Sequence, residues 1–535
     1  MTRIKQIIGL WALASLMILS SCFQSLNQTP FNELTSNQVY EDFDNYISVL
    51  AKLYAGLAVS GQEGPAGKPD IQGINEGFSS YLRQYWKAQE LPTDEAVIGW
   101  NDGSLPDYNT GTWGTGNEFV SAMYSRIFYQ VVLCNEFIRE TADEKLNERG
   151  LTADQIAATQ TFRAEARFLR ALSYWHAIDL FGSVPFVTED DPVGSFFPEQ
   201  ISRADLFAYV ESELQGMMED LAAARENEYG RADQAAAKML LAKLYMNAEV
   251  YIGQSRYAEA LALCQEILDA GYSLNDDYES LYLTDNNTSN EIIFPITFDG
   301  VRTRTWGGMT FLVHAPVGGT MDPDAFGING GWGGIRSTSA MVKIFDPGFD
   351  LDNDSLLNTT DERAMFYTDN QSPFVADIFT YEDGYGMTKF KNVDYVNGDT
   401  IPGSDVAGDH IDSDFPMFRL ADVYLMYAEA VVRGGGGSES QALDLVNQLR
   451  NRAGTTEVSS LDLDFLLDER ARELYWETHR RTDLIRFGKF TGDSYVWDWK
   501  GGVAEGAAIE GFRALFPIPA GDIVANPNLT QNDGY

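Results

Sequence analysis

The stretch that decides the fold is Leu466–Phe490, LLDERARELYWETHRRTDLIRFGKF. Apolar or small side chains recur there at i, i+4, i+7, i+8 and i+11, at Leu467, Ala471, Leu474, Tyr475 and Thr478. This spacing predicts a helix with one apolar face on a core. Charged side chains fill the other positions: Asp468, Glu469, Arg470, Arg472, Glu473, Glu477, Arg480, Arg481, Asp483 and Arg486.

The charges of this stretch support two interpretations. Helical spacing pairs opposite signs, Glu469 with Arg472, Arg470 with Glu473, and Glu477 with Arg480 and Arg481. Glu473 and Glu477 are also carboxylates one turn apart, a pattern that can serve acid–base catalysis. Because an arginine stands near each carboxylate and favours its ionised form, we expect an ion-pair network that holds the helix in place.

Two other segments have the pattern of helical hairpins. Arg231–Leu274 begins RADQAAAKMLLAKLYMNAE, and Arg419–Arg452 turns at four consecutive glycines, Gly434–Gly437. Small residues at the crossing let two helices approach closely, as in tetratricopeptide repeats, although the turn at Ile252–Ser255 is longer than in that repeat. We therefore expect a superhelical scaffold of such hairpins.

The fold class predicted is mainly α, with one large insertion. Helical periodicity covers Val39–Leu57, Phe78–Gln89, Glu118–Glu144 and most of Thr159–Val187. Periodicity is largely absent from residues 276–417, where EIIFPITF at Glu291–Phe298 predicts a strand. The chain is thus divided into a helical part (36–275), an irregular region of loops and short strands in which we expect function (276–417), and a C-terminal helical part (418–535).

The N-terminus has the features of a secretory signal. Arg3 and Lys5 precede the apolar run Ile7–Leu19, and the run ends in Leu-Ser-Ser-Cys at Cys22. This ending resembles a bacterial lipobox, which predicts a signal peptide at 1–21, lipidation of Cys22 and a polar tether at 22–35. The alternative is a coincidental cysteine near a signal cleavage site.

Composition excludes several classes of protein. The 535 residues carry 79 acidic and 38 basic side chains, a formal charge of −41, which disfavours nucleic acid as a partner. The three cysteines and four histidines form no zinc or iron–sulfur motif, and no HExxH, GxSxG or Walker loop is present. Cys134 and Cys264 lie in apolar helical contexts and are predicted to be buried thiols.

Four tryptophans are candidates for ligand contact. Trp113, Trp306 and Trp332 are flanked by glycines, and Trp100 lies in GWNDG. An exposed indole can stack on the apolar face of a sugar ring. The alternative is that glycine lets each tryptophan pack tightly inside the protein. Polar neighbours that can bind sugar hydroxyls are Asn101, Asp102, Asn329 and Arg336.

A weaker pattern concerns calcium. Asp350, Asp352, Asp354 and Asp361 follow the ligand order of a calcium-binding loop. The sixth position is Ser355 instead of glycine, and the last is aspartate instead of glutamate. We expect an acidic turn without a metal and retain calcium as the alternative.

The segment ERARELYWETHRRTDLIRFGKF resembles the C-terminal signature of the SusD/RagB family, although the family usually has glycine where Thr478 stands. Four further segments resemble the same family and together span nearly the whole chain: ELPTDEAVIGWND at Glu90–Asp102, Thr159–Val187, Arg231–Leu274 and Phe516–Tyr535. GINGGWGG at Gly327–Gly334 is also similar to a recurrent family segment.

This resemblance implies a function. Members of the family are lipid-anchored proteins of the bacterial outer membrane that bind oligosaccharides without breaking a bond and pass them to a SusC-like TonB-dependent transporter. It implies no cofactor and no enzymatic activity. Peptide capture, known for RagB-like members, is one alternative. A surface glycoside hydrolase is another, and it requires two carboxylates across a cleft.

Overall fold

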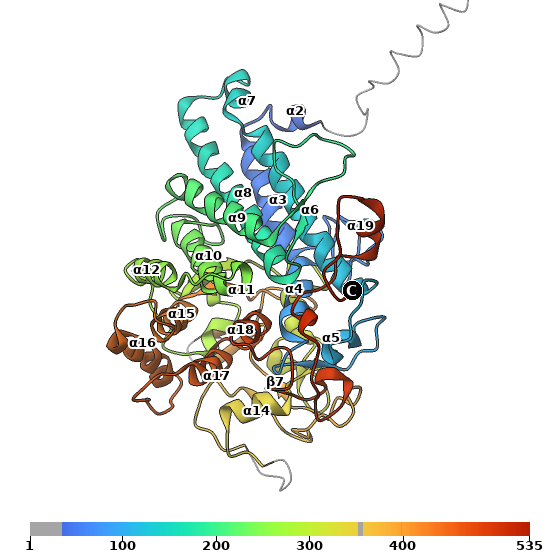
Figure 1. Cartoon of the computed structure of the whole chain (residues 1–535), viewed down its shortest axis with the longest axis vertical. Coiled ribbons are helices and arrows are strands. Elements are labelled where there is room, and N and C mark those ends of the chain that lie inside the picture. Colours follow the sequence, from blue (N-terminus) through green and yellow to red (C-terminus); the bar gives the residue numbers. More distant parts are fainter. Residues whose placement is uncertain (1–34, 351–356, 397–398) are drawn as a thin grey trace, which may run out of the picture.

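Helices form most of the chain, and the computed structural model describes residues 35–350, 357–396 and 399–535 (Figure 1). The mainly α class is confirmed. The helices before residue 276 are α2 (Ser36–Val39), α3 (Asp44–Ala58), α4 (Tyr81–Glu90), α5 (Pro106–Thr110), α6 (Glu118–Glu140), α7 (Asp143–Glu148), α8 (Ala153–Leu180), α9 (Arg203–Met217), α10 (Gln234–Met246), α11 (Ala248–Ile252) and α12 (Tyr257–Leu268). The later helices are α13 (Gly308–His314), α14 (Ser339–Phe345), α15 (Leu420–Val432), α16 (Glu439–Arg452), α17 (Leu463–Leu474), α18 (Arg480–Arg486) and α19 (Ala520–Ala525).

Both predicted hairpins are present, and they stack on each other. Helix α10 packs against α12, α15 packs against α16, and α12 packs against α15 (Figure 1). The long turn of the first hairpin contains the short helix α11, which explains its extra length. Small side chains such as Ala242, Ala260 and Ala428 are fully buried at these crossings. Helices α12 and α15, about 150 residues apart in sequence, are therefore neighbours in space. The insertion is the part of the chain that connects them.

The insertion is built from short strands, loops and two small helices. The ladders found among the described residues, inside and outside the insertion, are two-stranded and antiparallel. The predicted strand is confirmed as β4 (Ile292–Ile296), which pairs with β10 (Phe415–Arg419) at the end of the insertion. The other pairs are β1 (Val97–Ile98) with β5 (Ile335–Arg336), β2 (Val184–Pro185) with β3 (Gln200–Ile201), β6 (Phe366–Tyr367) with β7 (Gly386–Met387), and β8 (Val393–Val396) with β9 (Asp399–Pro402).

The deciding stretch forms two helices instead of one. Helix α17 ends at Leu474, and α18 begins at Arg480. Trp476 and Thr478 between them have φ values of +63° and +67°, a left-handed conformation that ends a helix. The expected single helix was therefore wrong after Leu474. Glycine adopts the left-handed backbone of Thr478 most readily, which agrees with the glycine expected at this position from the resemblance described above.

Most of the charged side chains of this stretch are buried in an ion-pair network, as we expected. Glu469 pairs with Arg472 at 2.9 Å, as predicted. The other predicted pairs were wrong, because the helix break changes the spacing and partners come from distant segments. Arg470 pairs with Asp422 and Asp483, at 2.8 and 2.7 Å.

The two ends of the described chain lie on the outside of the body (Figure 1). The C-terminal tail packs back on the helices, where Asn532 donates to the carbonyls of Phe181 and Phe516. Cys134 and Cys264 are buried free thiols, as predicted. Among the described residues, no helix has the length and apolar character that crossing a lipid bilayer requires. The signal peptide at 1–21, Cys22 and all of the tether except Thr35 lie outside the described residues.

Candidate functional site

Three of the four candidate tryptophans lie together. The ring centroids of Trp100 and Trp332 are 6.2 Å apart, and those of Trp332 and Trp306 are 6.3 Å apart. All three side chains are half-buried, so each keeps part of its surface open to solvent. We call this group, Trp100, Trp332 and Trp306, the aromatic arc, because successive rings are tilted by 46° and 61°.

A short antiparallel ladder brings two of these rings together. Strand β1 precedes Trp100, β5 follows Trp332, and the ladder continues through a hydrogen bond from the N–H of Gly99 to the carbonyl of Gly334. The indole N–H of Trp100 donates to the carbonyl of Trp332 at 3.4 Å. A Cβ at Gly334 would overlap the Trp100 ring, so only glycine lets the two segments approach this closely.

Two histidines pack against the arc. His314, at the end of α13, stacks on Trp332 with centroids 4.9 Å apart and an interplanar angle of 22°. His410 lies 4.8 Å from Trp306. Burial lowers the pKa of both imidazoles, so both are neutral at neutral pH. Sequence reasoning did not assign these histidines to the site, because no local pattern shows that His314, which is 18 residues before Trp332, or His410, which is 104 residues after Trp306, contacts these rings.

Arg83 on α4 is a further residue that sequence reasoning missed. Its guanidinium lies 4.4 Å from the Phe311 ring centre and 5.9 Å from that of Trp100. It donates to the carbonyl of Trp306 at 2.8 Å. Burial lowers the pKa of Arg83 to about 9. Arg83 therefore contacts two of the three tryptophans from the protein side. An arginine inside the apolar segment FSSYLRQYW was the one sequence feature that could have indicated its role.

Polar groups border the arc. Asn101 and Asp102 directly follow Trp100 and are exposed. Near Trp332, the side-chain amide of Asn329 donates to Asp409 at 2.6 Å. Apolar ring faces with amide and carboxylate groups at their edge can bind a molecule that has both a flat apolar face and hydroxyl groups.

Comparisons with known proteins show the family of this chain and agree with its fold. A sequence model of the SusD family matches residues 376–535. The starch-binding protein SusD of Bacteroides thetaiotaomicron is 34% identical over 578 aligned residues, which cover 100% of both chains. The chain belongs to the SusD family.

Solved structures of SusD relatives share the fold of this chain. A SusD superfamily protein from Parabacteroides distasonis superposes with a TM-score of 0.70 at 24% identity, covering 94% of this chain and 100% of that one. Surface glycan-binding protein A from Bacteroides thetaiotaomicron, solved in complex with laminarihexaose, superposes with a TM-score of 0.66 at 20% identity, covering 91% and 99%. At these identities the likeness concerns the fold.

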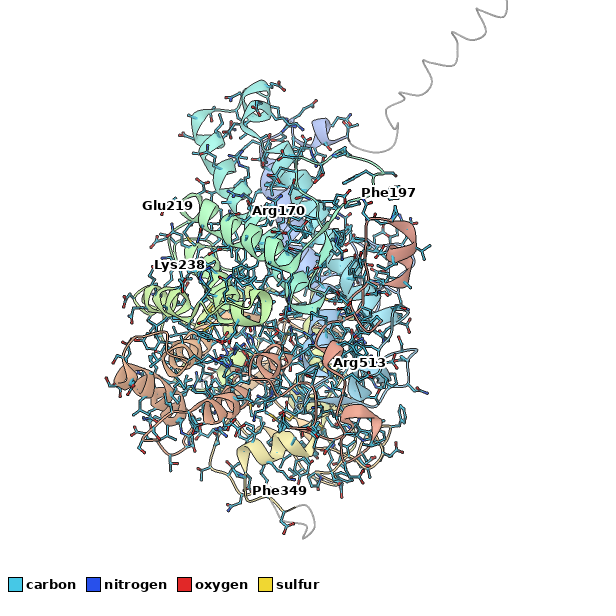
Figure 2. The ribbon with its side chains drawn as sticks, in the orientation of Figure 1. Arg170, Phe197, Glu219, Lys238, Phe349 and Arg513 are labelled. Carbon is cyan, nitrogen blue, oxygen red and sulfur yellow. The ribbon has the colours of Figure 1, made fainter. Side chains whose placement is uncertain are left out.

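Trp113 lies elsewhere in this SusD-family chain. Its side chain is fully buried, and its indole N–H donates to the hydroxyl of Tyr535 at 2.7 Å. Its ring packs 4.8 Å from Phe516, and Arg513, labelled in Figure 2, lies 5.6 Å from its centre. The expectation of an accessible ring is corrected here, because the glycines beside Trp113 allow tight packing against the C-terminal tail.

Arg336 is also placed in the interior. Its guanidinium is fully buried and donates to four backbone carbonyls, those of Gly334, Ile378, Thr380 and Asp383. All three nitrogens of the guanidinium are therefore used to hold loops of the insertion behind the arc. The expectation that Arg336 offers hydrogen bonds to a ligand is corrected for this reason.

The carboxylates of the deciding stretch do not form a catalytic pair in this SusD-family chain. Glu473 pairs with Arg363, Arg419 and Arg452, and Glu477 pairs with Lys389 and Arg419. Both are fully buried. Burial alone would raise their pKa, but the surrounding cations hold the pKa of each carboxyl below its usual range. An acid that stays ionised cannot donate a proton, which supports the structural interpretation.

Two of the four calcium candidates, Asp352 and Asp354, lie outside the described residues. Asp350 is exposed, and Asp361 is buried with both carboxylate oxygens bonded to Arg363, at 2.8 and 2.7 Å. Within the described ranges no group of histidine, cysteine, aspartate and glutamate side chains is arranged to hold a metal. Calcium therefore stays an untested alternative in which Asp361 would have to leave its arginine.

Proposed function

We propose that this SusD-family chain binds glycans, and that sugar rings stack on the aromatic arc. The observation that carries the proposal is the convergence of Trp100, Trp332 and Trp306 from three separate segments, with part of each ring open to solvent. Tryptophans that only packed against other protein groups would not need polar side chains at their edge. The exposed amide and carboxylate groups at the edge of the arc supply the hydrogen bonds that sugar hydroxyls require.

We further propose a starch-like α-glucan as the ligand. The 34% identity to a starch-binding protein over both whole chains supports this choice. The tilt between successive rings also supports it, because a curved platform keeps contact with several units of a curved chain. A straight, flat glycan would touch fewer of these rings at once.

In this proposal the protein is anchored to the outer membrane through a lipid on Cys22 and faces the cell exterior. It delivers glycan to a SusC-like TonB-dependent transporter, which supplies the energy. The resemblance of Leu19–Cys22 to a lipobox supports the anchor. Cell fractionation of Cys22→Ala tests it, and a variant that still partitions with membranes would overturn anchoring at this residue.

We propose binding without hydrolysis. Glycoside hydrolysis needs one carboxyl held protonated and a second one across the bond. The carboxylates of the deciding stretch are held ionised inside the core. Chromatography of glycan incubated with the protein tests this point. Shortened products that disappear in a single aspartate or glutamate variant would overturn it.

The central experiment is affinity gel electrophoresis of residues 23–535 against soluble polysaccharides that include amylopectin, laminarin and a β-mannan. Retardation by amylopectin is expected for the wild type, and Trp306→Ala and Trp332→Ala should migrate freely. Loss of one exposed stacking ring should weaken binding about tenfold or more. Lys238→Ala is the matched control, because Lys238 lies on the scaffold helix α10 (Figure 2). Absence of retardation by every polysaccharide would overturn the proposal.

A further inference from the structure

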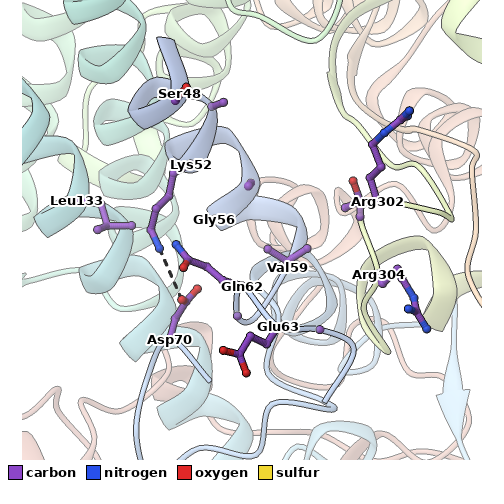
Figure 3. Close-up of a pocket in the computed structure, with 15 residues that line it drawn as sticks. Ser48, Lys52, Gly56, Val59, Gln62, Glu63, Asp70, Leu133, Arg302 and Arg304 are labelled. Atoms are coloured by element: carbon purple, nitrogen blue, oxygen red, sulfur yellow. Dashed lines mark ion pairs between the residues drawn. The ribbon is translucent and has the colours of Figure 1, made fainter. Parts of the chain in front are cut away.

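A groove of about 510 Å³ lies between α3 and the segment Arg302–Arg304 (Figure 3). Small residues of α3, namely Ala51, Ala55 and Gly56, form its floor. The labelled side chains of Arg302 and Arg304 point away from α3, so their backbone forms the opposite wall (Figure 3). We call this space the α3 groove. Its volume is within the range typical of small-molecule sites, about 300–1,000 Å³.

Three polar side chains converge at one end of the groove. Figure 3 shows Lys52, Gln62 and Asp70 pointing toward one another. The Nζ of Lys52 and the Oδ1 of Asp70 are 3.8 Å apart, which is longer than a hydrogen bond. Within the described chain Lys52 makes no hydrogen bond, so its donors are free for a ligand.

A buried arginine stands behind this cluster. Arg126 is 1% exposed, and its Nη1 lies 3.9 Å from Oδ2 of Asp70. Among the described residues, this nitrogen has no hydrogen-bond partner. Arg126 does not line the groove and this nitrogen is closed to solvent, so a ligand in the groove meets the positive charge only through the Asp70 carboxylate.

The chemistry of the cluster selects a neutral molecule with several hydroxyl groups. Lys52 offers donors, Asp70 offers acceptors, and the amide of Gln62 offers both. In the groove the charges of Lys52 and Asp70 oppose each other, and Glu63 in the lining offsets the buried Arg126 behind Asp70, so neither sign of charge dominates. Neighbouring hydroxyls of one sugar unit can accept from the ammonium and donate to the carboxylate at the same time.

The groove begins next to the aromatic arc. Arg304 is two residues before Trp306, which limits the distance between their Cα atoms to about 7 Å. The loop that carries Gln62 lies against the same segment, since a Cβ at Gly64 would overlap the carbonyl oxygen of Arg304. Trp306 and one wall of the groove therefore belong to the same short segment of chain.

We propose that the α3 groove is a second subsite for the same glycan chain, in which Lys52, Gln62 and Asp70 bind the hydroxyls of a sugar unit beyond Trp306. This inference rests on the proposed function. It predicts that longer chains, which reach both places, bind more tightly than short chains, which fill the arc alone.

Calorimetric titration of residues 23–535 with maltotriose and maltooctaose tests the proposal. For the wild type, maltooctaose should bind about tenfold or more tightly than maltotriose, as two or three added hydrogen bonds imply. The double variant Lys52→Ala, Gln62→Ala should lose most of that difference and keep its affinity for maltotriose. Ala51→Trp, which fills the groove from an exposed position on α3, should have the same effect.

Lys68→Ala is the matched control, because Lys68 is in the same loop, is exposed in its pair with Glu63 and does not line the groove. It should behave as the wild type. Equal affinity of the wild type for both ligands, or unchanged maltooctaose binding in the groove variants, would overturn the second subsite and leave the proposed function standing. Binding of neither ligand by the wild type would overturn both.

Discussion

Trp332 is held by His314 in two ways. The two rings stack with centroids 4.9 Å apart, and the backbone N–H of Trp332 donates to the carbonyl of His314 at 2.8 Å. The imidazole in turn bonds through Nδ1 to the carbonyl of Gly330 at 2.7 Å. The position of this tryptophan therefore depends on a neutral, buried histidine.

Glycan binding should weaken in acid because of these histidines. Burial lowers the pKa of His314 and His410, and nearby Asp409 opposes this only in part. As pH falls below about 6.5, protonation favours conformations in which the imidazoles leave the tryptophans for solvent. The dissociation constant, measured by calorimetry, should rise about tenfold between pH 7.5 and pH 5.

The charged groups around His410 also include Arg304 and Asp405. His314→Gln and His410→Gln should flatten the pH profile of binding, since glutamine does not titrate. Circular dichroism at each pH serves as the control for folding. A wild-type dissociation constant that is the same at both pH values would contradict this prediction.

Trp113→Ala should damage stability without removing the binding site. The ring is fully buried between Tyr108 and the C-terminal tail, so its loss leaves a cavity and costs about 3–5 kcal/mol. Chemical denaturation measures the cost. At low temperature the folded fraction should still bind glycan, in contrast to Trp332→Ala. A loss of affinity in folded Trp113→Ala would show that this residue belongs to the site.

Glu473→Gln should be strongly destabilising. The change leaves Arg363, Arg419 and Arg452 in the core with one anion fewer. Breaking a buried ion pair from one side costs about 3–5 kcal/mol. The free energy of unfolding in urea is the measurement. Glu266→Gln is the matched control, because Glu266 pairs with Lys238 at the surface, where a change within about 0.5 kcal/mol is expected. Equal effects of both substitutions would refute the network.

Glu90→Gln should stabilise the protein at neutral pH. Burial raises the pKa of Glu90, and the neighbouring carboxyl of Glu95 raises it further. The folded state thus holds a proton that the unfolded state releases above about pH 4.5, and stability falls as pH rises through the folded-state pKa. Glutamine imitates the protonated form and avoids this loss.

The gain from Glu90→Gln should disappear below about pH 4.5, where wild-type Glu90 is protonated in both states. Melting temperatures at pH 4 and pH 7.5 make the comparison. A variant that is less stable than the wild type at pH 7.5 would show that Glu90 is ionised in the folded protein, held by the N–H groups of Thr478 and His479 that it accepts from.

Local sequence patterns predicted the scaffold well. The hairpins α10–α12 and α15–α16 formed where small residues recur at helical spacing, because that pattern decides which faces can approach. The helix break after Leu474 was not predicted. Trp476 and Thr478 are not usual in a left-handed conformation, and bonds from their N–H groups to the distant Glu95 and Glu90 hold them there.

For the site, the sequence alone indicated that tryptophans are involved, but it did not show which tryptophans lie together. Trp113, Trp306 and Trp332 have similar glycine neighbours, yet one ring is sealed by the C-terminal tail and two are half-buried. Local composition determined the mainly helical scaffold, the loop-rich insertion and the presence of tryptophans in loops. The tertiary structure alone decided which rings meet, and it placed Arg83, His314 and His410 against them, because burial and contact depend on how separate segments of the chain come together.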